Sequence, residues 1–426
     1  MLKETSFWWE TMTLPAAHQG VWADSVDVAV IGGGITGLAA ARTLGRRGAR
    51  VAVLEAETFG WGASSRNGGM TLTGLKLGVP TLLTRYGRDL TRRLFAASLS
   101  AIDLVEQIVT DEGLACDFSR AGHLEVACKP AHFRYFQRSA EIMQSELKHA
   151  VRLVPRADLR AEVGSDLYHG GLVDPVSAGL NPARYVAGLA RAAQRAEVRL
   201  YDQARVQRFE RAAGGFRLTT ARGPLTAREV LIATGGYTGR AWPALQRRIV
   251  PIGSYVVATE RLPEAVARDL IPRRRMIFDS KNFLYYYRLT PDQRLLFGGR
   301  AAFRPETPAS VRESAELLRR GLVQVFPQLA QTAVEYAWGG TLDFAFDLMP
   351  HAGQSEGVHF ALGYAGHGVA LATYLGVRVA EALCGDAVDN PFTELAFPGA
   401  PLGLYNGNPW FLPLAEAWYR WLDLVS

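Results

Sequence analysis

The chain has 426 residues, more than a single hydrophobic core usually serves, so two closely associated domains are expected. Hydrophobic residues make up 48% and charged residues 21%, which excludes a largely disordered chain and supplies a large core. The net charge is only +6, and no basic block of the kind that binds nucleic acid stands out. We therefore expect no nucleic-acid partner.

The cysteines and the N-terminus bear on the compartment. Cys116, Cys128 and Cys384 are widely separated and show no C-x-x-C or metal-ligand spacing, so neither a disulfide nor a metal site is predicted. Residues 1–13 lack the charged head and apolar run of a signal peptide, and no window of about 18 apolar residues could span a membrane. We expect a soluble, cytoplasmic protein.

Residues 26–55 predict a strand, a glycine turn, a helix and a second strand. The first six are almost all apolar, which is typical of a strand buried on both faces of a parallel sheet. Gly32, Gly34 and Gly37 follow as G-x-G-x-x-G. This pattern permits a tight turn, a close approach of backbone to a pyrophosphate, and close helix–strand packing.

The helix predicted over residues 35–45 directs its first N–H groups and the positive end of its dipole at a diphosphate. Glu55 ends the second strand, 18 residues after Gly37, where a carboxylate accepts hydrogen bonds from ribose hydroxyls. A dinucleotide site is predicted, but the loop alone leaves NAD and FAD open. Its candidate residues are Gly32, Gly34, Ile35, Thr36, Gly37, Glu55 and Ala56.

Residues 59–70, FGWGASSRNGGM, contain too much glycine for a helix. The glycines let the backbone lie flat against a planar group, and the polar side chains between them supply hydrogen-bond donors. We expect this loop to run along a cofactor beyond its pyrophosphate; a plain surface turn is the alternative. Its candidate residues are Gly62, Ala63, Ser64, Ser65, Arg66, Asn67, Gly68 and Gly69.

The middle of the chain alternates between helical and extended patterns. Helices are predicted over residues 87–109, 134–150, 182–193 and 309–326, and strands over 121–128, 198–209, 215–220 and 228–233, with an antiparallel sheet within 249–299. The strand at 228–233 runs into Ala233, Thr234 and Gly235, where bare backbone meets a ligand at the carboxyl end of a strand.

A second glycine-rich turn follows the apolar strand predicted at residues 358–362. Gly363, Gly366, His367 and Gly368 precede a helix that reaches about residue 383. The N-terminus of this helix can direct N–H groups at an electron-rich site, such as the negatively charged edge of a reduced isoalloxazine.

These motifs, taken in order, make the chain resemble the D-amino-acid-oxidase-like (DAO) FAD oxidoreductases, which include sarcosine, glycine and γ-glutamylputrescine oxidases. It is most similar to the γ-glutamylputrescine oxidase branch. The motifs that carry the resemblance are SFWWET from Ser6, GASSRNGG from Gly62, ATGGYT from Ala233, LLFGGR from Leu295, WGGTLD from Trp338 and GYAGHGVALA from Gly363.

The resemblance implies FAD and an α/β fold with two parts. One is a doubly wound, Rossmann-type FAD domain built from discontinuous segments, and the other is an α+β substrate domain with a mostly antiparallel mixed sheet. The FAD segments would be residues 1–86, 176–240 and 338–426, and the substrate segments 87–175 and 241–337.

The resemblance also assigns residues to parts of the cofactor. Gly32, Gly34, Gly37 and Glu55 would serve the ADP half, with Val206 near the adenine, and residues 63–69 would pass the flavin ring. Gly366, His367 and Gly368 would face its pyrimidine edge. Further candidates along the same path are Ala233, Thr234, Gly235, Gly340, Gly363 and Val369.

Three departures from sarcosine oxidases are informative. Those enzymes attach flavin through a cysteine near the WGG position, whereas none stands near Trp338 here, so noncovalent FAD is predicted. They hold a substrate carboxylate with a lysine after Gly-His-Gly, where this chain has Ala370, which favours an amine over a small amino acid. Their oxygen-linked lysine is replaced by Leu296.

The predicted reaction is oxidation of a C–N bond in a primary or secondary amine or an amino acid derivative, by hydride transfer to flavin N5, which gives an imine. Orientation and a water-poor pocket would carry the rate. O₂ is the expected acceptor; a dehydrogenase passing electrons to a quinone is the alternative, and a tRNA-modifying flavoenzyme or a non-catalytic FAD-binding protein are remoter ones. Candidate pocket residues are Tyr285, Tyr286, Arg300, Trp338, Asp343, Tyr364 and His367.

Among those candidates we expect Tyr286 and Arg300 to orient the substrate and His367 to begin a helix. A C-terminal helix is predicted from about residue 409 to 425, with Glu416, Arg420 and Asp423 as a thin polar stripe on an otherwise apolar surface. We expect it to pack on its own domain; contact with a membrane surface is the alternative.

Overall fold

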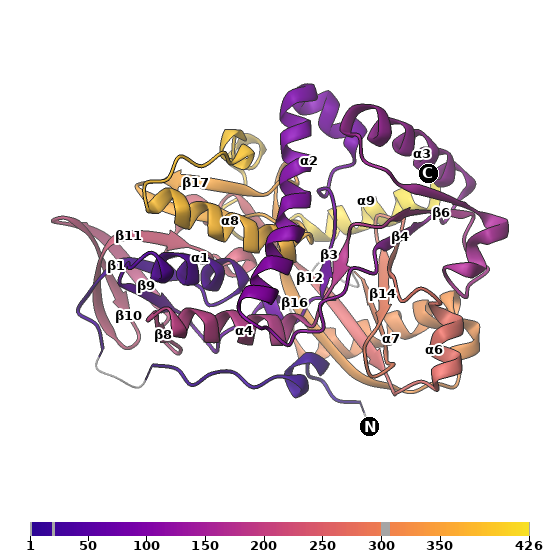
Figure 1. Cartoon of the computed structure of the whole chain (residues 1–426), viewed down its shortest axis with the longest axis horizontal. Coiled ribbons are helices and arrows are strands. Elements are labelled where there is room, and N and C mark those ends of the chain that lie inside the picture. Colours follow the sequence, from indigo (N-terminus) through magenta and orange to yellow (C-terminus); the bar gives the residue numbers. More distant parts are fainter. Residues whose placement is uncertain (1, 19–21, 300–306, 426) are drawn as a thin grey trace.

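The computed structural model describes residues 2–18, 22–299 and 307–425, and two eight-stranded sheets organise it (Figure 1). The first sheet has the order β17-β18-β11-β1-β2-β8, and the β9–β10 hairpin joins it through β11. Its strands are β1 Ser25–Ile31, β2 Val51–Leu54, β8 Arg199–Tyr201, β9 Val206–Ala212, β10 Gly215–Thr220, β11 Gly223–Ile232, β17 His351–Ser355 and β18 Val358–Leu362.

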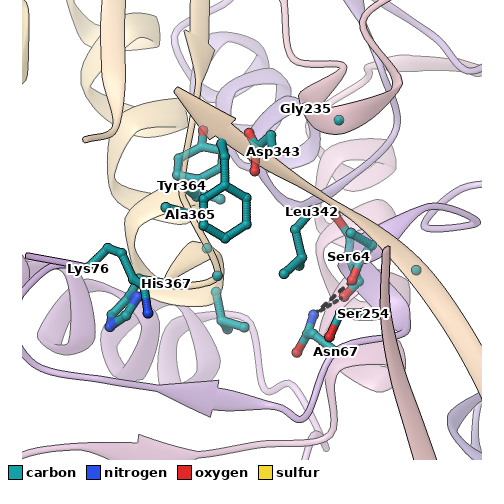
Figure 2. A pocket seen from close by; sticks show the side chains of 18 of the residues that line it. Ser64, Asn67, Lys76, Gly235, Ser254, Leu342, Asp343, Tyr364, Ala365 and His367 are labelled. Atoms are coloured by element: carbon teal, nitrogen blue, oxygen red, sulfur yellow. Dashed lines mark hydrogen bonds between the residues drawn. The ribbon is translucent and has the colours of Figure 1, made fainter. Parts of the chain in front are cut away.

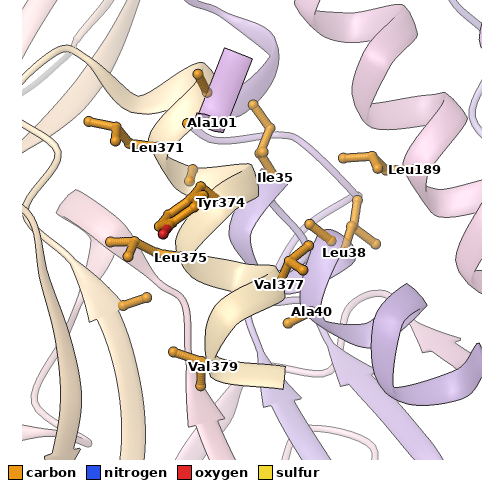
Figure 3. Packing of buried hydrophobic residues seen from close by; sticks show 14 of the residues in the cluster. Ile35, Leu38, Ala40, Ala101, Leu189, Leu371, Tyr374, Leu375, Val377 and Val379 are labelled. Carbon is orange, nitrogen blue, oxygen red and sulfur yellow. The ribbon is translucent and has the colours of Figure 1, made fainter. Parts of the chain in front are cut away.

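The centre of the first sheet is parallel. β18, β11, β1, β2 and β8 all run in the same direction, so their carboxyl ends meet at one edge. Helices α1 Ile35–Arg46, α4 Pro182–Arg195 and α8 Gly368–Leu383 cover one face, and Figure 3 shows α1 and α8 packed together through Leu38, Val377 and their neighbours. On the other face, β10 and Trp242 complete a separate core. The predicted Rossmann-type sheet is confirmed.

The second sheet has the order β16-β12-β15-β14-β13-β4-β6-β5, and all its neighbouring strands are antiparallel except β13 and β4. The predicted mixed, mostly antiparallel sheet is therefore confirmed. Its strands are β4 His123–Val126, β5 Arg152–Pro155, β6 Gly170–Asp174, β12 Ile249–Thr259, β13 Met276–Asp279, β14 Tyr285–Leu289, β15 Leu295–Gly299 and β16 Val334–Ala345.

The two faces of the second sheet have different roles. Tyr287 and Phe297 point to one face, where helices α6 Glu264–Leu270 and α7 Pro308–Val325 bury them. Because side chains alternate along a strand, Tyr286 points to the opposite face, which looks toward the first sheet. That second face is free to form one wall of a cavity.

Some helices differ from their predicted bounds. α2 runs Val79–Asp111 rather than beginning at residue 87, because two helices join at Gly87, whose φ of 74° is not helical. α3 spans Pro130–Ile142, so it begins and ends earlier than the predicted range of 134–150. The chain then passes into a π-helical turn, Met143–Leu147. The short elements are β3 Met70–Thr71, which pairs with β7 Ala178–Gly179, and helix α5 Pro243–Gln246.

The predicted five-segment division stays a proposal, and two elements bear on it. β16 belongs to the second sheet up to Ala345, so the predicted boundary at residues 337 and 338 falls inside a strand. Helix α2 packs through Leu94 and Ala101 against the helices of the first sheet, although it lies in a segment expected to serve the substrate domain.

The C-terminal helix α9 spans Leu412–Val425. Leu412 is buried, but Leu414, Trp418 and Trp421 on the same helix are exposed, so only part of the apolar surface packs on the protein. Within the described ranges, no helix is long and apolar enough to cross a membrane.

Candidate active site

A cavity of about 940 Å³ lies between the two sheets and is lined by residues of both. It is at the upper end of the roughly 300–1,000 Å³ that is usual for ligand and cofactor sites. We call it the central cavity. The predicted residues on its wall are Gly32, Gly34, Ile35, Thr36, Glu55, Ala56, Gly62, Ala63, Ser64, Arg66, Asn67, Gly68, Val206, Ala233, Thr234, Gly235, Tyr286, Gly340, Asp343, Tyr364, Gly366, His367, Gly368 and Val369.

The turn between β1 and α1 forms one end of the central cavity. Gly32 has a φ of +109°, which favours glycine. Gly37 faces away from the cavity, and a Cβ there would lie 2.0 Å from the Gly32 carbonyl oxygen, so it serves the close packing of helix on turn. The Ile35 N–H donates to Ser64 Oγ at 3.0 Å, which ties this turn to the 62–69 loop.

Glu55 lies at the carboxyl end of β2, beside this turn. Its Oε2 accepts the Gly33 N–H at 2.7 Å, and its Oε1 accepts the Glu57 N–H at 2.9 Å. Burial raises the pKa of Glu55, against the lowering effect of these backbone donors. The carboxyl group lines the cavity with lone pairs to spare, so the predicted ribose contact stays a prediction that the geometry accommodates.

The 62–69 loop is held from behind by its own side chains. The Arg66 guanidinium lies between the rings of Trp9 and Trp61, 4.6 and 4.7 Å from their centroids, and donates to the Trp61 and Gly339 carbonyls. Asn67 donates to the Ala63 and Ser64 carbonyls, and Figure 2 shows Asn67 beside Ser64. Because these side chains bond back to the loop and its neighbours, the backbone of the loop faces the cavity.

Two predicted residues of this loop stand behind the wall. Ser65 is fully buried and accepts a hydrogen bond from the Trp9 indole N–H at 2.7 Å. Gly69 has a φ of +66°, and a Cβ there would lie 2.0 Å from the Leu180 carbonyl oxygen. The N-terminal tryptophans that hold the loop, Trp8 through Asn67 and Trp9 through Ser65, were not predicted as part of the site.

The N-terminus of α8 forms another part of the wall. His367 is its N-cap residue, as predicted, and Gly366 precedes it with a φ of +90°. Thr36 of α1 shares a 2.7 Å hydrogen bond with the Tyr364 hydroxyl, so the two helix N-termini are fixed relative to each other. Two positive helix ends thus face one cavity.

His367 is uncharged at neutral pH. Burial, with a smaller contribution from Lys76, lowers its pKa to about 3. Figure 2 shows Lys76 beside it on the wall opposite Ser64 and Asn67. The Nδ1 atom of His367 is buried and has no hydrogen-bond partner among the described residues. A ligand in the cavity would find a neutral imidazole there.

Asp343, on β16, holds the turn that leads into α8. Its Oδ2 accepts the Gly363 N–H at 2.7 Å, and its carbonyl accepts the Ala365 N–H at 2.9 Å. Burial raises the pKa of Asp343 to about 6. Gly363 itself lies off the wall, so Asp343, which lines the cavity, holds the glycine turn through this hydrogen bond. Figure 2 shows Asp343 close to Tyr364 and Ala365 of that turn.

The other pocket candidates separate clearly. Tyr286 lines the cavity, and its ring fills the space over Gly298, where a Cβ would lie 2.3 Å from Cζ. Tyr285 points to the α7 side, as the strand alternation requires. Trp338 is buried behind the wall and donates from Nε1 to the Arg66 carbonyl at 2.7 Å. Arg300 lies outside the described residues.

The cavity continues beyond the predicted residues, over the strands β4, β6 and β13. Alternation in residues 121–128 predicts a strand but not its neighbours, so these wall residues were missed. Charged and polar residues among them include Lys76, His123, Glu125, Asp174, Asp279, Ser280, Lys281 and Asn282. In the described part of the chain, no group of His, Cys, Asp and Glu could hold a metal ion.

A parallel sheet with two helix N-termini at one cavity, which a second sheet also lines, is the arrangement of a nucleotide-binding α/β fold. The model of the family DAO, "FAD dependent oxidoreductase", matches residues 27–382. The chain therefore belongs to the DAO family of FAD-dependent oxidoreductases.

Curated relatives cover most of the chain. The gamma-glutamylputrescine oxidoreductase of Escherichia coli is 33% identical over 85% of this chain and 84% of its own. A probable oxidoreductase OrdL of Haemophilus influenzae is 32% identical over the same shares. The crystal structure of glycine oxidase from Geobacillus kaustophilus matches 88% of this chain and all of its own with a TM-score of 0.74 at 22% identity.

The cofactor of this family fits the residues present. FAD combines a diphosphate with a flat ring, and the central cavity offers a helix N-terminus at the β1–α1 turn and a bare-backbone loop further along. The neutral Ser64, Asn67 and His367 add no charge that would oppose an anion. FAD is the cofactor that the family and this cavity share.

Proposed function

We propose that the protein oxidises a C–N bond of a primary or secondary amine, or of an amino acid derivative, to an imine that water then hydrolyses. The observation that carries this proposal is the cavity that lies between the 62–69 loop and Tyr286 of the second sheet. The names of the relatives, gamma-glutamylputrescine oxidoreductase and glycine oxidase, support an amine or amino acid as substrate.

The residues of the cavity would act by binding, orientation and exclusion of water. When bound, FAD supplies a hydride acceptor at N5. Gly366, His367 and Gly368 begin a helix whose positive end would stabilise negative charge beside it. Tyr286 is partly buried, its pKa is raised further above the ordinary value of 10 by burial, and it would pack against the substrate as a neutral phenol. Arg300, the partner proposed from the sequence, lies outside the described residues.

O₂ is the proposed electron acceptor, with a quinone as the second candidate. One observation favours the second candidate: the exposed large apolar residues of the described chain are concentrated near its C-terminus, at Leu402, Leu404, Trp410, Leu414, Trp418, Tyr419 and Trp421. Exposed apolar side chains in such number are typical of an interaction surface, including a membrane interface where quinones reside.

Anaerobic mixing with a panel of amines tests the main proposal. We expect at least one amine to bleach the flavin absorbance, and admitted oxygen to restore it. Bleaching by no amine or amino acid would contradict the proposal and would favour a non-catalytic FAD-binding protein. Slow reoxidation by oxygen with fast reoxidation by a soluble quinone would instead support the dehydrogenase.

Lipid co-sedimentation separates the two positions of α9. The full chain should pellet with vesicles, and a chain ending at Pro409 should not, if the aromatic face binds a membrane. Equal behaviour of both chains would mean that α9 has a purely structural role.

A cytoplasmic location also stays a proposal, supported by the three free thiols Cys116, Cys128 and Cys384.

A further inference from the structure

One transverse row of residues crosses the cavity-facing side of the second sheet. Strand register pairs each residue with the next, and residues paired in register share a face. From β6 to β16, the row is Leu172, Glu125, Phe278, Tyr286, Gly298, Val256 and Trp338. The row gives positions along the cavity that the sequence alone does not order.

The β14–β16 end of this row lies against the 62–69 loop. Trp338 donates to the Arg66 carbonyl, and a Cβ on Gly68 would lie 3.0 Å from Cε2 of Tyr286. The site proposed for the flavin ring is therefore at this end. Phe278 and Val256, which stand on either side of the Tyr286–Gly298 pair in the row, are apolar and line the cavity.

Glu125 stands near the opposite end of the row and lines the cavity. Tyr286 and Glu125 are the two residues of the row with ionisable side chains. Two strand spacings separate β4 from β14, which places the two backbones about 10 Å apart. A substrate that reacts beside Tyr286 and reaches Glu125 must therefore extend over several bonds. Phe278 lies between them and offers an apolar surface to such a chain.

Glu125 differs from the other carboxyl groups of the cavity wall, each of which has a partner. Glu55 and Asp343 accept backbone N–H groups, Glu57 pairs with Arg205 at 2.7 Å, and Asp279 pairs with Lys281 at 3.0 Å. Asp174, the remaining carboxyl group of the wall, also has partners, because its carboxylate accepts hydrogen bonds from Thr73, His149 and the Val176 N–H.

No described residue donates a hydrogen bond to Glu125 or forms an ion pair with it. Burial raises its pKa to about 7, and the positive charge of Lys76 offsets only part of that effect. The Glu125 side chain is partly buried and lines the cavity without a protein donor, so a cation brought by a ligand could form a charge-assisted hydrogen bond with its carboxylate.

We propose that Glu125 binds a second, cationic nitrogen of the substrate, so that the enzyme selects diamine-type substrates over monoamines. This inference rests on the proposed amine oxidation and adds its substrate class. The nitrogen whose C–N bond is oxidised lies at the flavin end of the row. The carbon chain lies over Phe278, and the distant ammonium group pairs with the Glu125 carboxylate.

The test compares diaminohexane with hexylamine in the FAD-loaded enzyme. The wild type should show a higher kcat/KM for the diamine, and Glu125→Gln should lower the diamine-to-monoamine ratio by about 10- to 100-fold, mainly through the KM for the diamine. Glu125→Asp, which keeps the charge, should retain a measurable preference. Bound-flavin absorbance reports whether each variant is folded.

Glu141→Gln, an exposed change on α3, is the matched control and should keep the wild-type ratio. A wild-type enzyme without preference for the diamine, or an unchanged ratio in Glu125→Gln, would overturn the inference while leaving amine oxidation intact. If neither amine nor any other amine bleaches the flavin, the proposed function fails first, so the two failures are distinguishable.

Discussion

At the scale of single residues, the β1–α1 turn depends on the absence of side chains at Gly37. A Cβ there would lie 2.0 Å from the Gly32 carbonyl oxygen and 3.1 Å from Cγ1 of Val30, and backbone cannot move aside as a flexible side chain can. Local close packing, rather than contact with cofactor, is therefore the structural role of this glycine.

We expect Gly37→Ala to destabilise the protein by about 1–3 kcal/mol through overpacking and to weaken FAD retention. Thermal unfolding and the flavin-to-protein absorbance ratio would measure both effects. Gly399→Ala is the control, because its Cβ would meet nothing within 4 Å and its φ is not positive. Equal behaviour of the two variants would contradict the packing argument.

Asp343 makes a pH-dependent contribution to stability. Burial raises its folded pKa to about 6 from an ordinary value near 3.8, so the native state binds more protons than the unfolded state between these values. Its contribution to the free energy of unfolding therefore falls as pH rises from about 4 to about 6. The ionised form stays buried, held mainly by the Gly363 N–H.

Asp343→Asn should gain stability relative to the wild type as pH rises through this window, because the amide never ionises. Denaturant unfolding of both proteins at several pH values between about 4 and 7 measures the difference, and other groups that titrate cancel in the comparison. A difference that does not change with pH would show that Asp343 is not the titrating group.

At the scale of elements, α9 is tied to the cavity wall by one carboxylate. Asp423 accepts the N–H groups of Asn282 and Phe283 at 2.8 and 2.9 Å and the Asn282 side-chain amide at 2.9 Å. Lys129 donates to the Asp423 carbonyl. Because Asn282 lines the cavity, the C-terminal helix supports the pocket although it lies outside it.

We expect Asp423→Ala to loosen residues 280–283 and to raise KM several-fold with a smaller change in kcat, since charged hydrogen bonds of about 1.5–3 kcal/mol each are lost. Steady-state kinetics and limited proteolysis of this loop would detect the change. Leu414→Ala, on the exposed side of the same helix, should behave as wild type. A raised KM in both variants would mean that the helix acts through its stability alone.

Elements formed by local patterns could be predicted, and those set by distant pairing could not. The strand at Ser25–Ile31 and the helix at Ile35–Arg46 agree with the predicted ranges within a residue, because glycine spacing and apolar periodicity define them. The clamp of Trp9 on Ser65 and the row containing Glu125 arise from contacts between segments far apart in the chain. No local pattern encodes strand register across a sheet.

At the scale of the whole molecule, the cavity is lined by both sheets, so we expect binding of FAD to be coupled to the stability of the fold. A ligand that binds only the native state stabilises it, by about 2.7 kcal/mol when its concentration is a hundred times Kd. None of the three cysteines lines the cavity, and its wall near β16 is formed by Gly340 and its neighbours. Noncovalent binding of FAD stays the prediction made from the sequence.

We therefore expect acid precipitation to release yellow FAD into the supernatant and leave a colourless pellet. Apoprotein prepared under milder conditions should unfold at a lower temperature than the holoprotein, and added FAD should restore the original Tm, because the two sheets lose the ligand that fills the space between them. Colour retained in the acid pellet would contradict noncovalent binding. An apoprotein with unchanged Tm would show that the sheets close without the cofactor, and the coupling argument would then fail even if the flavin is released.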